Sequence, residues 1–178
     1  SYTGSDSIAD LLLRAHRKMR DTLDQAWSLK DKDLPYSSAY EALIMASIVE
    51  KETGLATERA AIAGVFVRRL RLGMRLQTDP TVIYGLGNQF SGNLRRSHLK
   101  QKTVYNTYVI HGLPPTPIAM PSAAAIDAAL HPEDGDSLYF VARGDGGHYF
   151  SSTLEQHKRA VRKYQIFRRA KNYTSTPQ

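Results

Sequence analysis

The 178-residue chain contains no cysteine. This absence excludes disulfide bonds, thiolate metal sites and a cysteine nucleophile, although it does not assign a compartment. The six histidines include no His-Glu-x-x-His segment or comparable ligand pair, so we expect no bound metal. Gly85-Leu-Gly87 lacks the third glycine of a dinucleotide-binding turn. The sequence therefore predicts neither a metal nor a cofactor.

Long hydrophobic runs are also missing. No stretch approaches the roughly 20 apolar residues that a membrane-spanning helix needs. No basic segment followed by an apolar one resembles a signal peptide. The chain opens at Ser1 without a methionine, and we interpret it as a piece of a longer protein. Its length suits one domain with a real core, so we predict a single domain over residues 1–178.

Acidic residues are absent after Glu155. That segment holds seven basic residues, whereas the other 17 Lys and Arg match the 17 Asp and Glu of the chain. The net charge of +7 is therefore local, and we expect no nucleic-acid partner. Two interpretations stay open, a solvated helix face and a contact with an anionic surface. The basic residues are Lys158, Arg159, Arg162, Lys163, Arg168, Arg169 and Lys171.

Apolar residues recur at helical spacing in several segments. The pattern predicts helices over about 8–27, 38–53, 58–72 and 122–130, the third capped by Thr57. Segments 138–142 and 148–151 flank a glycine-rich turn, which predicts an antiparallel hairpin followed by a last helix. Residues 74–121 show little periodicity, and Pro80 is expected to keep Asp79 out of a helix. The predicted fold class is α+β, mostly helical with one small sheet.

The second predicted helix carries the candidate catalytic residue, Glu50. It follows a segment, 42–49, that is apolar on nearly all sides and should be buried. At 100° per residue, Glu50 shares a face with Ser47, whereas Glu52 points to the opposite side. Burial and the negative end of the helix dipole both predict a raised pKa for Glu50, which suits a proton donor. The alternative is that Glu50 marks the helix end and pairs with Lys51, Arg59 or another base.

The aperiodic stretch holds a plausible binding set. Sugars are commonly held by aromatic faces with a few fixed hydrogen bonds around them. Tyrosines, amides and a carboxyl of this kind are gathered here, although the same residues could pack the core and satisfy the loop backbone. The candidate residues are Gln77, Thr78, Asp79, Tyr84, Tyr105 and Asn106.

Several ordered segments resemble the YceG-like family, the endolytic murein transglycosylases also known as MltG. The resemblance covers most of the chain from about residue 38 to 160. The segments that carry it include Ala46-Ser-Ile-Val-Glu-Lys-Glu-Thr53 and Leu76-Gln-Thr-Asp-Pro80. The other segments are 69–75, 81–85, 105–108, 112–115, 118–119, 129–132, 138–142 and 146–150.

The resemblance implies a lyase that cleaves peptidoglycan between N-acetylmuramic acid and N-acetylglucosamine without water. It places the catalytic acid/base at Glu50, on a helix similar to that of the lysozyme-like transglycosylases. By analogy with those enzymes, Gln77 and the Tyr105-Asn106 pair would support the substrate. Glu52 and His148, which lie in matched segments, complete the expected substrate-binding set.

Family members carry an N-terminal membrane anchor and a LysM-like domain before the catalytic part, so the resemblance implies that this chain is the catalytic portion alone, without them. The resemblance further implies work at the periplasmic face of the inner membrane beside peptidoglycan synthases, ending the growth of nascent strands. Two alternatives stay open. One is a hydrolytic muramidase that uses Asp79 or Glu52 as a second carboxyl, and the other is a non-catalytic glycan-binding module.

Overall fold

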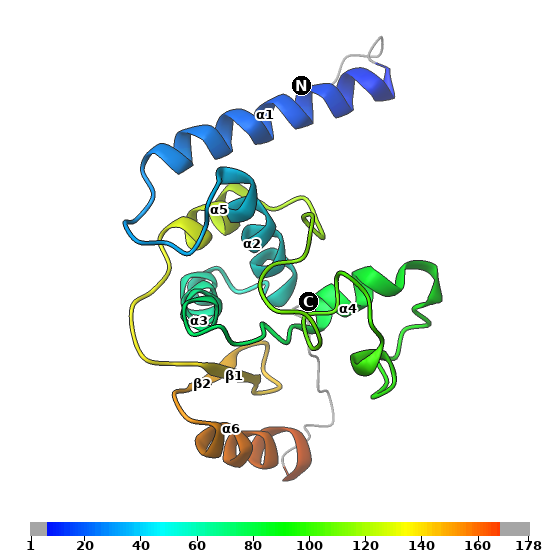
Figure 1. Ribbon diagram of the computed structural model, residues 1–178, viewed down its shortest axis with the longest axis vertical. Helices are drawn as coiled ribbons and strands as arrows, with labels where there is room; N and C mark the ends of the chain where they lie inside the picture. The colour runs from blue at the N-terminus through cyan, green and yellow to red at the C-terminus, as the bar shows by residue number, and fades with distance from the viewer. Residues whose placement is uncertain (1–6, 168–178) are drawn as a thin grey trace.

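The computed structural model describes residues 7–167 as a set of helices and one hairpin. Figure 1 shows α2 near the middle, α1 across one end, and the hairpin with α6 at the other end. Short 3-10 turns lie at 56–58, 87–89 and 98–100, and a π-helical turn at 162–167 continues α6. The predicted α+β class with one small antiparallel sheet is confirmed. The elements are α1 Ile8–Ser28, α2 Ala39–Glu52, α3 Arg59–Arg71, α4 Asp79–Leu86, α5 Ala123–Leu130, β1 Tyr139–Ala142, β2 His148–Ser151 and α6 Leu154–Val161.

The centre of the core is α2. Its residues from Ile44 to Val49 are all buried, as the apolar run 42–49 predicts. The helix packs against α1, α3, α4 and α5. A residue at its C-terminal end is therefore held by neighbours on several sides, which is the position of Glu50.

Capping residues set most helix starts where the sequence predicts them. Ser7 and Asp10 form a capping box at α1, and the Ser38 and Ser122 side chains accept bonds from the first turns of α2 and α5. The prediction that Thr57 caps the third helix is wrong, because a 3-10 turn at 56–58 leads into α3 and Glu58 takes the cap position. At the other end of α3, Gly73 adopts a φ of 65°, as expected for a C-terminal glycine.

A short helix, α4, interrupts the stretch predicted to be aperiodic. The prediction that Pro80 keeps Asp79 out of a helix is wrong, because Asp79 is the first residue of α4. Proline is tolerated in the first turn, where its missing N–H has no helical partner to lose. Thr78 is instead the extended residue, with φ −111° and ψ 125°. Helix α4 fixes the direction in which Asp79 leaves the backbone.

The hairpin separates two environments. Its strands pair in antiparallel register, with Phe140 opposite Phe150 and Val141 opposite Tyr149. Phe140 meets Phe66 of α3 edge to face at 5.6 Å, so one face of the hairpin closes the core. Side chains alternate along a strand, so Val141 and Tyr149 lie on the other face, which α6 covers.

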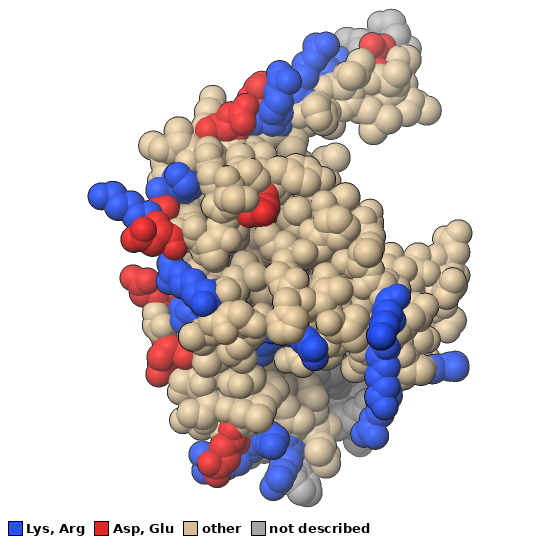
Figure 2. All heavy atoms as spheres, in the orientation of Figure 1, with Lys and Arg blue, Asp and Glu red and all other residues tan. Residues whose placement is uncertain are grey.

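Charge is unevenly distributed over the face drawn in Figure 2. Acidic side chains lie mainly along the left edge, interleaved with basic ones, whereas the lower right side shows basic side chains without acidic neighbours. Three of the C-terminal basic residues, Arg168, Arg169 and Lys171, lie outside the described residues. Among the described helices, none combines the length and apolar character that crossing a bilayer requires.

A buried arginine joins α3 to the candidate site loop. Arg69 is only 7% exposed, and its guanidinium donates to the carbonyls of Leu76 at 2.6 Å and Leu138 at 2.7 Å. The same group lies over the ring of Tyr139, 5.2 Å from its centroid. Arg69 therefore ties the chain just before Gln77 to α3 and to the start of the hairpin.

We expect Arg69→Met to lower the free energy of unfolding by about 3 kcal/mol, because it leaves buried carbonyls without donors. Urea denaturation measures the loss. The matched control is Arg75→Met, at an exposed side chain, which should change stability by less than about 0.5 kcal/mol. Equal effects of the two substitutions would contradict the structural role of Arg69.

Candidate active site

Glu50 lies in the last turn of α2 and bonds to the start of α5. Its Oε2 accepts hydrogen bonds from the Ser122 hydroxyl at 2.6 Å and the Ser122 backbone N–H at 3.0 Å. The Ser122 hydroxyl also accepts a bond from the Ala125 N–H, which fixes its own proton toward Glu50. Among residues 7–167, no hydrogen bond involves Oε1 of Glu50, so one carboxyl oxygen is anchored and the other is left for a ligand.

Ser47, one turn earlier on α2, holds the same loop. Its hydroxyl accepts a hydrogen bond from the Ile118 N–H at 2.9 Å and donates to the Ile44 carbonyl at 2.7 Å. Ser47 and Glu50 therefore both face segment 118–122, which confirms that they share a face of the helix. Two tethers one helical turn apart fix this segment relative to α2, and with it the Glu50 carboxyl.

The prediction of a raised Glu50 pKa is wrong. Burial is the largest single influence and does raise the pKa, as expected. The two hydrogen bonds from Ser122 and the positive charges of Arg59 and Lys51 outweigh it, so the pKa lies below its ordinary value. The carboxylate also lies at the N-terminal, positive end of α5, which the sequence did not reveal. Glu50 is therefore ionised at neutral pH in the free protein.

Glu52 points away from Glu50, and its pKa is shifted in the opposite direction. Its Oε2 accepts a bond from the Thr78 hydroxyl at 3.2 Å. Burial, and then repulsion by Asp79, raises the pKa of Glu52 to about 8, against the opposing effects of Thr78 and Arg69. The free protein therefore holds a neutral carboxyl at Glu52 and an ionised one at Glu50.

Asp79 and Thr78 stand side by side but differ in access. Asp79 is exposed, and its Oδ1 accepts a hydrogen bond from the Tyr108 hydroxyl at 2.6 Å. Thr78 is 1% exposed and its hydroxyl is bonded to Glu52, so it supports the loop from behind. The Thr78 carbonyl accepts from the Thr81 hydroxyl, which lies 2.8 Å from that of Thr107. In this conformation the side chain of Thr78 cannot reach a saccharide.

Gln77 adopts an unusual backbone conformation. Its φ is 51°, in the left-handed region that non-glycine residues avoid at a cost of about 1–2 kcal/mol. The Gln77 N–H donates to the Thr107 carbonyl at 3.1 Å, which holds the strained residue in place. Its side chain is exposed. Strain of this kind at an exposed polar residue is a mark of a functional loop.

Asn106 is turned into its own loop. Its side chain is 1% exposed, and its amide nitrogen donates to the carbonyls of His98, Leu99 and Gln101. Its amide oxygen accepts from the Tyr108 N–H at 3.0 Å. The amide is thus used up in holding segment 98–108, which argues against the substrate contact predicted for it and leaves it a positioning role.

Tyr84 and Tyr105 form an aromatic pair. Their rings meet edge to face with centroids 4.8 Å apart, and Tyr84 is 45% exposed. The Tyr105 hydroxyl lies 2.8 Å from that of Thr116. A side chain at Gly85 would approach Tyr105 to 3.0 Å, so the glycine permits this close packing. Tyr84 therefore offers an aromatic face to a ligand, and Tyr105 backs it.

His148 lies on the hairpin face that closes the core. Its Nδ1 is 2.8 Å from Oε2 of Glu58, and its backbone N–H donates to the other oxygen of the same carboxylate. The ring is largely buried and meets Phe140 edge to face. This pairing ties β2 to the turn before α3, and no bond connects His148 with Glu50. Within residues 7–167, no three His, Asp or Glu side chains are gathered as a metal ion would require.

The contact between Ser122 and Glu50 could not be identified from the sequence. The signal for a helix start at Ser122 was present, but nothing along the chain relates it to a residue 72 positions away. The structure brings Glu52, Thr78 and Asp79 together, and it pairs Tyr84 with Tyr105. Lys51 and Arg59 act on Glu50 through their charge, in line with the alternative that it pairs with bases, but the bonds to its carboxyl come from Ser122.

We expect Ser122→Ala to raise the pKa of Glu50, because the substitution removes the hydrogen bond from the hydroxyl and the orientation that this bond gives to the carboxylate. A ¹³C NMR titration of the Glu50 side-chain carboxyl measures the change. Ser38→Ala is the matched control, since it removes a similar cap at the other end of α2, at a cost of about 1 kcal/mol. A Glu50 pKa that is the same in Ser122→Ala as in wild type would contradict the assigned geometry.

The raised pKa of Glu52 makes the free energy of unfolding fall as the pH rises. Its pKa is raised from 4.5 to about 8, so the folded protein binds a proton that the unfolded chain releases. The stabilisation is full below about pH 4.5 and is lost as the pH rises through about 8. We expect Glu52→Gln to be more stable than wild type at about pH 9, as measured by thermal unfolding. Glu155→Gln makes the same substitution at an exposed residue and should keep the pH dependence of stability that wild type shows. A Glu52→Gln protein that also keeps the wild-type pH dependence would contradict a neutral Glu52.

Comparisons with known proteins come from sequence and from structure. An endolytic murein transglycosylase of Bacillus subtilis is 42% identical over 127 residues, which cover 71% of this chain and 35% of that protein. One of Streptococcus pneumoniae is 34% identical over 166 residues, covering 89% of this chain and 29% of that protein. The chain therefore spans about a third of the length of these curated relatives.

A solved structure of a yceG-like protein from Listeria monocytogenes is similar in fold. It superposes with a TM-score of 0.71 at 38% sequence identity, covering 89% of this chain and 52% of that one. The family model described as the YceG-like family matches residues 1–163. The chain belongs to the YceG-like family.

Proposed function

We propose that the chain cleaves the glycan strands of peptidoglycan internally, as a lytic transglycosylase, with Glu50 as its acid and base. The observation that carries the proposal is the position of Glu50. One of its oxygens is fixed by Ser122 and the other is unbonded within the described residues. Family membership and the name shared by the relatives, endolytic murein transglycosylase, support the choice of substrate.

The reaction takes two steps. Neutral Glu50 donates its proton to the glycosidic oxygen between N-acetylmuramic acid and N-acetylglucosamine as that bond breaks. The resulting carboxylate removes the proton from the C6 hydroxyl of the muramic acid, whose oxygen attacks C1. The product carries a 1,6-anhydro ring, and no water is consumed. One carboxyl is sufficient because the nucleophile is already tethered to the reacting ring.

The lowered pKa of Glu50 suits the second step and works against the first. Burial is already the largest influence on this carboxyl, and a bound glycan would remove the water that remains around it. Desolvation favours the neutral form, so we expect substrate binding to raise the Glu50 pKa toward the value that an acid needs. The substrate itself would then switch the residue from a resting carboxylate to a proton donor.

The surrounding residues divide into those that can contact a glycan and those that support them. Gln77, Asp79 and Tyr84 are exposed and lie on α4 or just before it, so we assign the substrate contacts to them. Less exposed residues hold this group in place: the buried Thr78 and Asn106 through hydrogen bonds, and the half-buried Tyr105 through its ring. The strained backbone of Gln77 fits a side chain aimed at a ligand.

The place of action belongs to the same proposal. An enzyme that cuts nascent strands would work at the periplasmic face of the inner membrane, beside the peptidoglycan synthases, and would end strand elongation there.

We expect Glu50→Gln to lower the rate of peptidoglycan cleavage by about 100- to 10,000-fold, because the isosteric amide can neither give nor take the proton. Mass spectrometry of the released fragments measures the rate. Glu155→Gln makes the same chemical change at an exposed residue of α6 and should retain the wild-type rate. A Glu50→Gln protein that still cleaves at the wild-type rate would refute the proposal.

The same spectra separate the lyase from a hydrolytic muramidase. The hydrolytic muramidase is the second candidate function. The raised pKa of Glu52 favours it, because a glycosidase that uses water needs a neutral carboxyl as well as an ionised one, and Glu52 is the neutral carboxyl at pH 7. A lyase leaves 1,6-anhydro ends, whereas a hydrolase leaves reducing ends that are heavier by one water, about 18 Da. Reducing ends, combined with loss of activity in Glu52→Gln, would overturn the transglycosylase assignment.

A further inference from the structure

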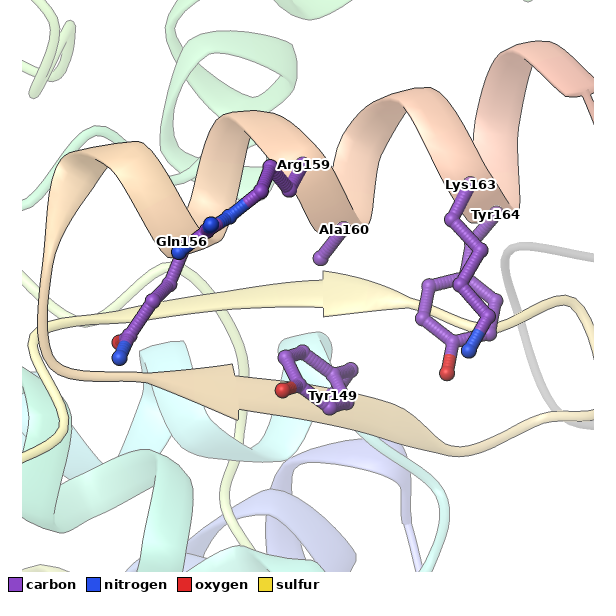
Figure 3. Close-up of a pocket in the computed structure, with 6 residues that line it drawn as sticks. All are labelled: Tyr149, Gln156, Arg159, Ala160, Lys163 and Tyr164. Atoms are coloured by element: carbon purple, nitrogen blue, oxygen red, sulfur yellow. The ribbon is translucent and has the colours of Figure 1, made fainter.

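A groove of about 330 Å³ lies between the hairpin and α6, and it shares no residue with the Glu50 site. Figure 3 shows Tyr149 on β2 facing side chains from α6 and from the turn that follows it. Its volume is at the lower end of the range of small-molecule sites. The lining residues are Tyr149, Gln156, Arg159, Ala160, Lys163 and Tyr164.

The polar groups of the groove are mainly hydrogen-bond donors. Arg159 and Lys163 are exposed, and neither forms an ion pair with any residue in the described range. The oxygen of Gln156 is occupied, because it accepts bonds from the Ser152 and Thr153 N–H groups. Its NH₂ group is therefore the part left to bind a ligand. The lining contains no Asp or Glu, so the groove offers mainly hydrogen-bond donors and two positive charges.

Two tyrosines supply flat faces beside these charges. The rings of Tyr149 and Tyr164 have centroids 5.8 Å apart and are tilted by 38°. The ammonium of Lys163 lies 5.0 Å from the centroid of Tyr164, which holds the cation at the groove. Aromatic faces beside cationic donors match a ligand that has sugar rings and carboxylates in the same molecule.

Only some of the basic side chains of α6 and the turn after it line the groove. Figure 2 shows basic side chains gathered over this helix. Arg159 and Lys163, four residues apart, line the groove, whereas Lys158 and Arg162, which are also exposed, do not. Only Arg159 and Lys163 are therefore placed to contact a ligand in the groove. Within the described part of the chain, the basic residues that follow Glu155 thus divide into a pair at the groove and a pair outside it.

We propose that this groove is a second, non-catalytic binding site for the carboxylated part of peptidoglycan, the muramic acid with its stem peptide. The inference rests on the proposed function for its ligand, but it concerns a different surface. The groove would hold a strand, or a neighbouring strand, away from the bond that Glu50 cleaves. An anionic membrane is the competing occupant, and the concave, tyrosine-lined shape favours a ring-sized ligand over a flat surface.

The test measures binding without cleavage, in the Glu50→Gln background. The probe is a soluble muropeptide, a disaccharide with a peptide that carries free carboxylates, titrated while backbone amide NMR shifts of β2 and α6 are followed. We expect Arg159→Gln/Lys163→Gln to weaken binding at least about tenfold. Lys158→Gln/Arg162→Gln makes the same charge change on the same helix and should weaken it by less than about twofold at 0.15 M salt. Tyr149→Ala, a single change on β2, should also weaken binding.

Three outcomes would overturn the inference. The first is an equal loss in both double variants, which would indicate general attraction to a basic helix. The second is unchanged affinity for a muropeptide whose carboxylates are amidated. The third is that phosphatidylglycerol vesicles, and not the muropeptide, require Arg159 and Lys163. Failure here leaves the release of 1,6-anhydro products by wild type untouched, so it is distinguishable from failure of the proposed function.

Discussion

The contact between Ser122 and Glu50 joins the end of the buried helix α2 to the first turn of α5, and the arrangement of the site depends on it. Ser122 does two jobs at once, since its hydroxyl caps α5 and orients the carboxyl. Ser47 reinforces the contact by holding Ile118, four residues before Ser122. The Glu50 carboxyl is thus fixed by the packing of two helices, and rigid elements of this kind hold catalytic groups more accurately than loops do.

Two carboxyls, two residues apart on one helix end, experience opposite environments. Glu50 turns toward donors and positive charge, whereas Glu52 turns toward Asp79 and the protein interior. Pairs of acids whose pKa values are pushed apart are typical of sites that handle protons. Here the ionised member is the one with an oxygen that has no hydrogen bond within residues 7–167, and the neutral member is bonded to Thr78. In our interpretation Glu50 is the reacting group, and the neutral Glu52 holds the loop that carries Asp79 without adding another negative charge.

Local features of the fold could be predicted from the sequence, and long-range contacts could not. The apolar run 42–49 identified the buried helix, and the 100° rule correctly placed Ser47 and Glu50 on one face. The sign of the Glu50 pKa shift was wrong, because it depends on a serine 72 residues away. Helix α4 was missed because Pro80 was interpreted as a barrier, although a proline in a first turn costs little. Asn106 was a reasonable sugar ligand by type, but its amide faces inward, and no local pattern records that direction.

The central claim is that a bound glycan converts the resting carboxylate of Glu50 into an acid. The most direct test is the pKa of Glu50 with an uncleavable peptidoglycan oligosaccharide bound, in which sulfur replaces the glycosidic oxygen. We expect the carboxyl ¹³C titration of Glu50 to move to a higher pH on binding, while that of Glu155 stays where it is in the free protein. A Glu50 pKa that remains below its ordinary value in the complex would contradict its role as the proton donor.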